Sequence, residues 1–438
     1  MYDRSEGVQA RPSRTAVSGR RIAAYAVALA TSTASADPDT RPALSTHGWT
    51  VDLTGYVQAD AVAYAQASQD QLDPATGAPL AQEHVAIPRA SLRVDGHKGA
   101  LAGELELEAF TSRATVPEPT QTSGVRIETA QVAWRHERLV EVVGGLFRTP
   151  FGASTPVSPR DRIFLELPTV NRALFPGDID GGVMVHGSYG VARYSVAMMN
   201  GALAGDAQWK GQDPSSSYDF VGRLGADWST KAFWGHPHVE LGVSALTGHG
   251  LHPGTPPTKD HIQWVDDNHD GMIEQTELQV IPGTPGEPSQ TFAHSALGID
   301  AAFSWCLQWA GPGKASFEGE IATDLDRGLY VADPVANSRK LRELGFQIGA
   351  VQQLGPHALA GIRYDRYDAD RDATEQRYTL VGVHRVFSTW AFLAATTWDN
   401  TRVSLEYDRA RNPLGRDDSG APATREDDRV VLRAQAGF

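Results

Sequence analysis

Hydrophobic and polar residues alternate one by one along much of the chain. The first such segment covers residues 49–61, where alternate positions carry the apolar residues Trp49, Val51, Leu53, Val57, Ala59 and Ala61. The intervening positions carry Asp52, Thr54, Tyr56, Gln58 and Asp60. Successive side chains of a β-strand point to opposite faces, so this pattern predicts a long strand with one apolar and one polar face.

The same alternation recurs in "LAGELELEAF", "HVELGVSAL", "SFEGEIATD" and "TRVSLEYDR". Their polar positions carry Glu104, Glu106, Glu108, Glu240, Glu318, Glu320, Arg402, Glu406 and Asp408. The pattern predicts an all-β protein. Alternation alone fits a soluble sandwich, whose polar faces meet water, and equally a transmembrane barrel, whose polar faces line the lumen.

The connections between these segments distinguish the two architectures. Short turns such as "DGHKGA", "HERL", "SYG", "AGPGKA" and "LGPHA" alternate with long polar loops at residues 66–84, 111–124, 149–180, 201–216, 249–291, 326–341 and 412–426. Short periplasmic turns and long extracellular loops are typical of bacterial outer-membrane β-barrels, and the count is about sixteen antiparallel strands. The connection at 387–400 is longer than this layout predicts and leaves room for an extra hairpin.

The last segment and the aromatic residues support the barrel. "DRVVLRAQAGF" places Val430, Leu432, Ala434, Ala436 and Phe438 on one face, and Arg429, Arg433 and Gln435 on the other. A closing strand that ends in phenylalanine is similar to the signal read by the barrel-assembly machinery. Aromatic residues near strand ends suit the girdles at the lipid interfaces, although they also suit the core of a soluble β protein: Trp134, Trp228, Trp305, Trp309 and Tyr407.

The N-terminal residues predict export. "RRIAAYAVALATSTASA" combines basic residues, a short apolar run and small residues, as in a secretory signal peptide over residues 1–36. We expect residues 37–48 to be a short periplasmic segment and residues 49–438 to form the barrel, in the lipid of the outer membrane. No later run approaches the roughly 20 apolar residues that a membrane helix needs.

Composition narrows the function. The formal net charge is −14, which argues against a nucleic-acid partner, and the single cysteine, Cys306, excludes an internal disulfide framework. The chain has no nucleophile elbow and no His-Glu-x-x-His motif, and we interpret the histidines of "GHGLH" and "GHPHVE" as solvated. The sequence therefore predicts a protein that is not an enzyme.

One motif in the loop 249–291 suggests a metal site. In "DDNHDGMIEQTE" the spacing of an EF-hand loop places oxygen ligands at Asp266, Asn268, Asp270, the Met272 carbonyl, Glu274 and Glu277, with Gly271 at the sharp turn. The motif occurs once and lacks the flanking helices of an EF-hand. We expect a structural Ca²⁺ that orders the loop, and the alternative is an acidic surface turn with chance spacing.

From "VVGGLFRTPFG" onward the sequence resembles the phosphate-selective porin O and P family. The similar segments include "RIFLELPTVNRALFPGDIDGGVMVHG", "YSVAMMNG", "DFVGRLGADW", "VELGVSALTG", "ALGIDAAF", "FEGE" and "GIRYDRYD", in order between Val51 and Phe438. The resemblance implies a sixteen-stranded homotrimeric barrel whose third long loop, residues 149–180, folds inward to narrow the pore. Family members that select phosphate use lysines at the narrowest point, and lysine is rare here.

The inward loop implied by this resemblance brings charges of both signs to the constriction: Arg148, Arg160, Arg162, Glu166 and Arg172, with Asp161, Asp178 and Asp180 nearby. Such a mixture creates a transverse field across a pore, although some of these charges could equally lie on the solvated rim. The strand faces add candidates for the lumen wall: Arg89, Arg93, Glu104, Glu106, Glu240, Glu318, Glu320, Arg363, Arg402 and Arg433.

The resulting expectation is a water-filled outer-membrane channel for passive diffusion of small polar or anionic solutes, including phosphate. Two alternatives stay open. One is a plugged or structural barrel that displays the calcium-stapled loop for surface binding. The other is a soluble secreted calcium-binding β protein, which would partition into buffer without detergent.

Overall fold

The structure, a computed structural model, describes most of the chain beyond residue 42. The described residues are 43–66, 68, 83–114, 120–136, 138–174, 179–201, 218–229, 237–252, 257–264, 272–273, 275–286, 290–307, 309–324, 341–368, 386–413, 415–417, 419, 421 and 423–438. The expected signal peptide, residues 1–36, lies outside the described residues.

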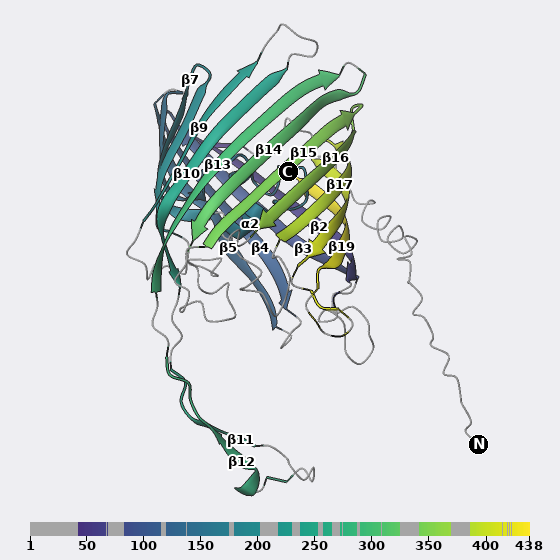
Figure 1. The fold of residues 1–438 in the computed structure, drawn as a ribbon. Coiled ribbons are helices and arrows are strands. Elements are labelled where there is room, and N and C mark those ends of the chain that lie inside the picture. Colours follow the sequence, from purple (N-terminus) through teal and green to yellow (C-terminus); the bar gives the residue numbers. More distant parts are fainter. Residues whose placement is uncertain are drawn as a thin grey trace, which may run out of the picture.

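Sixteen antiparallel strands form a closed barrel (Figure 1). They are β2 (Trp49–Gln66), β3 (His84–Lys98), β4 (Leu101–Ala114), β5 (Thr120–His136), β6 (Val140–Arg148), β7 (Ile179–Tyr189), β8 (Ala192–Met199), β9 (Asp219–Ser229), β10 (His238–His252), β13 (Gln290–Leu307), β14 (Gly311–Asp324), β15 (Leu341–Leu354), β16 (Ala358–Asp368), β17 (Val386–Trp398), β18 (Thr401–Asn412) and β19 (Arg425–Gly437). β19 pairs with β2, which closes the ring and confirms the predicted architecture and strand number.

The first and last strands meet at the short-turn end. Phe438 and Gly55 exchange two backbone hydrogen bonds, with N···O distances of 3.2 and 3.0 Å. Beyond this point the short strand β1 (Ala43–Thr46) pairs with residues 49–52 of β2. Part of the segment expected to precede the barrel therefore extends its sheet.

The two faces of the wall differ as the alternation predicts. On β10, Leu241 and Val243 are 46% and 56% exposed on the outer face, whereas Ser244, which points inward, is 1% exposed. The same contrast separates exposed Leu405 from buried Glu406 on β18. Because the outer face of the closed ring is apolar and its inner face is polar, the outside suits lipid and the inside suits a polar lumen. No helix in the described ranges is long and apolar enough to cross a membrane.

One connection differs from the sequence prediction. Residues 387–400, expected as a long connection, are strand β17 and the two-residue turn at Asp399 and Asn400. Both faces of β17 are apolar, with Ala391, Leu393 and Ala395 buried on the inside and Trp390 exposed on the outside. The sequence of this segment therefore lacks the alternation of apolar and polar residues, and the pattern did not predict a strand there.

The connection between β6 and β7 folds into the lumen. Its apolar side chains Phe151, Leu165 and Val170 are almost fully buried. Residues 169–174 form the short helix α2 (Thr169–Leu174), which is visible inside the barrel in Figure 1. These side chains form an apolar core inside the lumen, between the barrel wall and residues 149–174. We call this segment the inward loop.

Glycines on the wall make room for the inward loop. A Cβ atom placed on Gly298 of β13 would lie 2.9 Å from the Phe151 ring, and one on Gly345 of β15 would lie 2.2 Å from Val170 Cγ2. Real Cβ atoms do not approach so closely, so side chains at these positions would displace the loop. The wall and the loop therefore fit each other at two places.

The long connection between β10 and β13 carries a separate hairpin. It consists of β11 (His261–Trp264) and β12 (Leu278–Ile281), with the 3-10 turn η2 (Gln275–Glu277) before β12. The hairpin lies beyond the barrel on the side of the long loops (Figure 1).

Candidate functional site

The inward loop is attached to the wall through Glu166. Its carboxylate lies 3.3 Å from the Arg433 guanidinium of β19 and 3.6 Å from that of Arg89 of β3. Its backbone carbonyl accepts a 2.8 Å hydrogen bond from Arg363 of β16. Burial on its own raises the pKa of Glu166, but the positive charges of Arg89 and Arg433 outweigh burial and hold the pKa below its usual range.

Carboxyl groups of three further strands hold the residues on both sides of Glu166. The Glu406 carboxylate accepts a 3.0 Å hydrogen bond from the backbone N–H of Leu165. Thr169, at the start of α2, donates to Asp365 at 2.9 Å, and Asn171 donates to Glu320 at 2.9 Å. Three strands, β14, β16 and β18, thus fix this segment through hydrogen bonds to carboxyl groups.

The start of the loop is held by Glu318 of β14. Its carboxylate accepts hydrogen bonds from the backbone N–H groups of Ala153 and Ser154, at 2.9 and 3.3 Å. Gly152 has a φ of 66°, a conformation that favours glycine, and a Cβ there would lie 2.0 Å from a Glu318 oxygen. Glycine is therefore required for this close approach of loop to wall.

The middle of the loop reaches the last strand. The Arg160 carbonyl accepts hydrogen bonds from Gln435 of β19 at 3.0 Å and from Arg402 of β18 at 3.3 Å. Gln58 of β2 donates to the Pro159 carbonyl at 3.4 Å. These contacts use backbone carbonyls, and the Arg160 guanidinium makes no hydrogen bond or ion pair with the residues that the structure describes.

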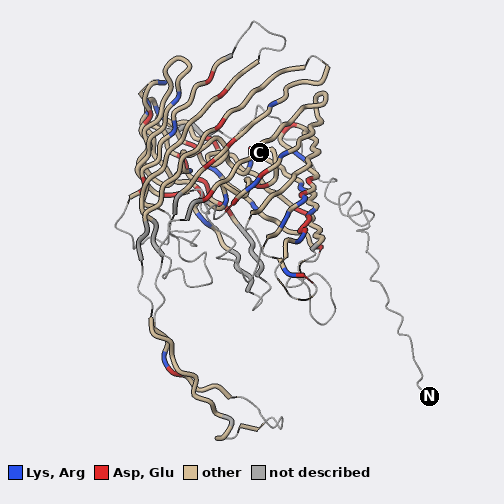
Figure 2. Tube along the Cα trace, viewed as in Figure 1, with Lys and Arg blue, Asp and Glu red and all other residues tan. Residues whose placement is uncertain are grey.

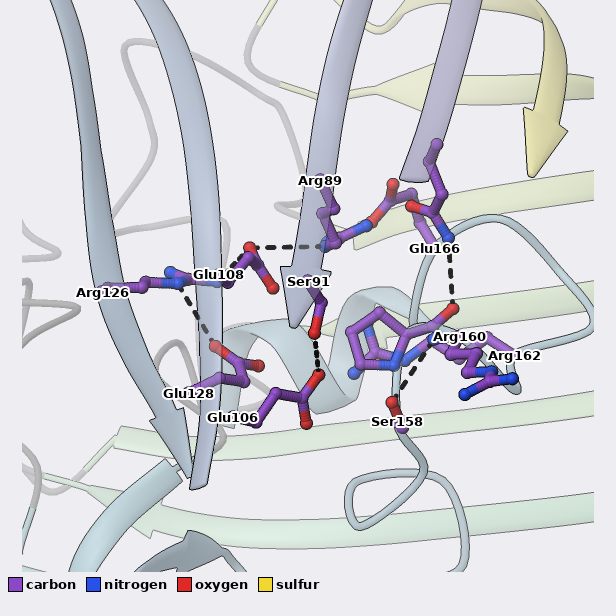
Figure 3. A network of polar contacts seen from close by, with 12 residues as sticks. Arg89, Ser91, Glu106, Glu108, Arg126, Glu128, Ser158, Arg160, Arg162 and Glu166 are labelled. Carbon is purple, nitrogen blue, oxygen red and sulfur yellow. Dashed lines mark hydrogen bonds and ion pairs between the residues drawn. The ribbon is translucent and has the colours of Figure 1, made fainter. Parts of the chain in front are cut away.

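An ion-pair network joins β3, β4, β5 and β6 on the inner wall, and Figure 3 shows its members Arg89, Glu108, Arg126 and Glu128. Arg126 bridges Glu108 and Glu128, with N···O distances of 2.9 and 3.2 Å. Arg148 reaches Glu128 at 2.7 Å, and Arg89 approaches Glu108 at 4.0 Å. Arg89 also reaches Glu166 of the inward loop at 3.6 Å, so the network and the loop meet at this residue (Figure 3).

The guanidinium groups of this wall are more exposed than their carboxylate partners. The Arg126 side chain is 29% exposed and its partner Glu108 is 2% exposed. Arg93 is 38% exposed and its partner Glu104 is 15% exposed, since Glu104 also accepts hydrogen bonds from Thr129 and Gln131. Asp95, the other partner of Arg93, is 33% exposed, so guanidinium groups are more accessible than carboxylates in each of these pairs, least clearly at Arg93. Figure 2 shows both signs of charge on the barrel strands.

The predicted lumen residues all lie on the inner face of the barrel, but they do not form one site. Arg89, Glu318, Glu320, Arg363, Arg402 and Arg433 contact the inward loop or the residues that hold it. Glu106 is buried and accepts a 2.5 Å hydrogen bond from Ser91. Glu240 lies near the short turns instead, where it pairs with Lys314 at 3.2 Å and with His238 at 3.3 Å.

The charged residues predicted for the constriction loop also do not form one site. Arg148 is the last residue of β6, and Asp180 belongs to β7 rather than to the loop. Arg162 is 9% exposed and donates to the Val157 carbonyl at 3.2 Å, whereas Arg172 is exposed on α2. Asp161 is exposed, and Asp178 lies outside the described residues.

The predicted calcium ligands are mostly outside the described part of the chain. This holds for Asp266, Asn268, Asp270 and Glu274, and for the side chain of Glu277, whose backbone ends η2. Met272 is described and is 70% exposed.

Sequence reasoning missed two members of the wall network, Arg126 and Glu128. They lie in "GVRIETAQVAW", where Glu128 and Thr129 are adjacent and both buried. The register between β4 and β5 shifts at this point, because Glu106 pairs with Thr129 and Leu107 pairs with Ile127. The bulge leaves Glu128 as an extra residue and breaks the alternation that would have placed it in the lumen.

A scan against protein-family models finds no match for this chain, and a search of curated proteins finds none either. Among solved structures, the outer-membrane channel DcaP of Acinetobacter baumannii is similar with a TM-score of 0.52 and 12% identity, over 90% of this chain and 99% of that chain. OprB of Pseudomonas putida has a TM-score of 0.54 and 10% identity, over 89% and 94% of the two chains. These likenesses show the fold alone.

The outer-membrane protein OmpT of Vibrio cholerae has a TM-score of 0.51 and 9% identity, over 91% of this chain and all of that chain (100%). The chain therefore has the barrel fold of outer-membrane channels along most of its length. Together with the apolar outer face, this fold places the protein in a bacterial outer membrane.

Proposed function

We propose that the protein is a diffusion channel that passes small polar solutes and prefers anions. The observation that carries this proposal is the exposure of arginines in front of buried carboxylates on β3, β4 and β5, as for Arg126 and Glu108. Acidic residues outnumber basic ones in the chain, 53 to 39, but a permeating ion responds most strongly to the charges nearest to its path.

Two arginines of the inward loop also favour a preference for anions. The Arg172 side chain is exposed and that of Arg160 is partly exposed. Within the described ranges neither guanidinium has a hydrogen bond or an ion pair, whereas Glu166 on the same loop is bound to two arginines. Asp161 on the same loop is also exposed and offsets one of the two arginines, so the free charge of these three side chains is positive by one unit.

Single-channel recording of the refolded protein in a planar bilayer tests this function. We expect discrete conductance steps and, in a salt gradient, a reversal potential of the sign that marks anion selectivity. The opposite sign would show that the carboxylates control permeation. Absence of conductance from folded, heat-modifiable protein would contradict the channel and favour a plugged barrel.

Phosphate is a candidate solute because of the resemblance to the phosphate-selective porins. The arginines of the wall and loop offer the planar donor pairs that bind phosphate oxygens, but without the compact charge of lysine. Addition of inorganic phosphate to a chloride-conducting channel distinguishes the cases. A phosphate-selective channel would show reduced chloride current at low phosphate concentration, and a general anion channel would not.

The proposed assembly is a homotrimer in outer-membrane lipid, inserted by the barrel-assembly machinery through the strand that ends at Phe438. A relative of similar fold, OmpT of Vibrio cholerae, is described in a trimer form. The mass of the detergent-solubilised protein from sedimentation equilibrium tests the assembly. Deletion of Phe438, which pairs with Gly55 where the barrel closes, should reduce insertion.

We also propose that Ca²⁺ binds the segment 266–277 and orders the tip of the hairpin formed by β11 and β12. Carboxylate and carbonyl oxygens at EF-hand spacing support the metal, and the position of the hairpin beyond the barrel supports a role outside the pore (Figure 1). Such a hairpin could serve surface recognition as a second function. Deletion of residues 255–288 separates the two functions, because a pore would still conduct and a surface-binding activity would be lost.

A further inference from the structure

A polar cavity lies at the short-turn end of the lumen, between the inward loop and strands other than those that bind Glu166. Its volume is about 490 Å³. The strands β5 to β9 form its wall, and Pro150, Gly152 and Pro156 of the loop close it from within. A cavity of this size accommodates a small organic molecule.

Positive charge dominates the lining. Four arginines and one histidine line the cavity, namely Arg135, Arg138, Arg193, Arg223 and His186, whereas Glu141 is the one carboxylate among the lining residues that the structure describes. Glu141 is already engaged, because Arg135 donates two hydrogen bonds to it at 2.8 and 3.1 Å.

The other guanidinium groups differ in how far they are neutralised. Arg223 makes two hydrogen bonds to Asp300, at 3.1 and 2.6 Å, and Arg193 pairs with Asp227. Arg138 is exposed, and its guanidinium has no hydrogen bond or ion pair to any residue in the described ranges. One cation that lines the cavity is thus available to an incoming anion.

The remaining lining is apolar. Met184, Pro150 and Pro156 provide surface without further charge. A hydrated inorganic ion gains no binding free energy from contact with an apolar surface. A ligand with an anionic end and a small apolar body would satisfy Arg138 and also bury the apolar lining.

We propose that this cavity is a binding subsite for a small organic carboxylate with an apolar body, at the periplasmic exit of the channel. The role of this subsite in transport rests on the proposed function, because the carboxylate reaches the exit only if the protein is a channel that passes anions. The subsite holds the carboxylate at Arg138 beside the exit and so raises its local concentration there, whereas chloride passes without being held.

Isothermal titration calorimetry of the detergent-solubilised protein with benzoate tests the subsite. We expect benzoate to bind the unmodified protein, acetate to bind more weakly because it lacks the apolar body, and Arg138→Gln to weaken benzoate binding about tenfold, the scale of one charge-assisted hydrogen bond. The matched control is Arg409→Gln, which removes an exposed arginine from the outer face near the long loops. Heat-modifiable migration verifies that each variant is folded.

Three results would overturn the subsite: no benzoate heat from folded protein, equal heats from Arg138→Gln and the unmodified protein, or equal loss in Arg138→Gln and Arg409→Gln. Conductance of the same samples in potassium chloride distinguishes this failure from failure of the proposed function. Anion-selective conductance without benzoate binding contradicts the subsite alone. Benzoate binding without conductance supports the subsite and contradicts the channel.

Discussion

The Glu166 carboxylate of the inward loop lies 3.3 Å from the Arg433 guanidinium of the last strand. Arg433 also donates two 2.8 Å hydrogen bonds to Asp60 of the first strand and one to the Leu165 carbonyl at 3.0 Å. One buried guanidinium therefore joins the first strand, the last strand and the loop. Closure of the barrel and narrowing of its lumen depend on the same residue.

Replacement of Glu166 by glutamine should increase anion selectivity. The change removes the negative charge that Arg89 and Arg433 now share, while Arg433 keeps Asp60 as a partner. A unit charge about 7 Å from the ion path changes the energy of an ion by roughly 0.6 kcal/mol in water, with opposite sign for an anion and a cation, so the anion-to-cation permeability ratio should rise by up to roughly sevenfold at low salt. The reversal potential measures this ratio, and Glu426→Gln, at an exposed pair with Arg409, is the control.

Glu166 also makes the attachment of the inward loop depend on pH. Because Arg89 and Arg433 hold the pKa of Glu166 below that of a free glutamate, about 4.3, its ionised form stabilises the attachment of the loop above that pH. The stabilisation is lost as the pH falls through the lowered pKa. Single-channel conductance attributable to Glu166 should be constant from pH 7 to about 5 and change only below about 4.

Glu166→Gln provides the comparison for this titration. The variant lacks the titrating group, so its conductance should not show the Glu166-dependent change at low pH. If the unmodified protein and the variant change together between pH 7 and 5, other lumen carboxylates control the loop.

The strand pattern could be predicted from sequence because it is local. A residue such as Leu241 or Ser244 shows by its neighbours alone which face it occupies. The prediction was wrong at β17, which was expected to be part of a connection. Its inward-facing Leu393 is as apolar as its outward-facing Trp390, because the inner face of this strand is packed inside the barrel, so the sequence shows no alternation.

The attachment of the loop could not be predicted in this way. Leu165 meets Glu406 across 241 positions of sequence, and Asn171 meets Glu320 across 149. Neither asparagine nor leucine carries a local signal that names its partner. The bulge at Glu128 adds a second cause, because one extra residue reverses the face assignment of all that follows.

Gly345 should be intolerant of a side chain. Gly345→Ala places a methyl group where Val170 Cγ2 now lies, 2.2 Å away, so α2 must shift from the wall. Overpacking of this kind costs about 1–3 kcal/mol, which should lower the temperature at which the barrel loses its heat-modifiable migration. Gly144→Ala is the control, because a Cβ at Gly144 meets no atom within 4 Å. Equal effects of the two substitutions would show that the fit at Val170 is not important.

Removal of calcium should alter the hairpin without altering the pore. With Ca²⁺ bound to residues 266–277, proteolysis of this segment should be slow, and chelation or Asp270→Ala should accelerate it, because binding stabilises the folded form. Channel conductance should be the same in all three cases. Calorimetry of Ca²⁺ binding supplies the direct test, and identical heats from the unmodified protein and Asp270→Ala would contradict the metal site.

The two loop arginines without partners should determine much of the anion preference. Arg160→Gln and Arg172→Gln each remove a positive charge from the lumen, so each should reduce the anion-to-cation ratio by up to roughly sevenfold at low salt, and the double variant by roughly the product. Neither side chain makes a hydrogen bond or an ion pair within the described residues, so the loop should remain attached through Glu166, Glu318 and Glu406. Arg409→Gln, on the outer face, should leave the reversal potential unchanged. An unchanged reversal potential in the double variant would instead assign the selectivity to Arg93 and Arg126 of the wall, whose guanidinium groups are the next most exposed on that side of the lumen.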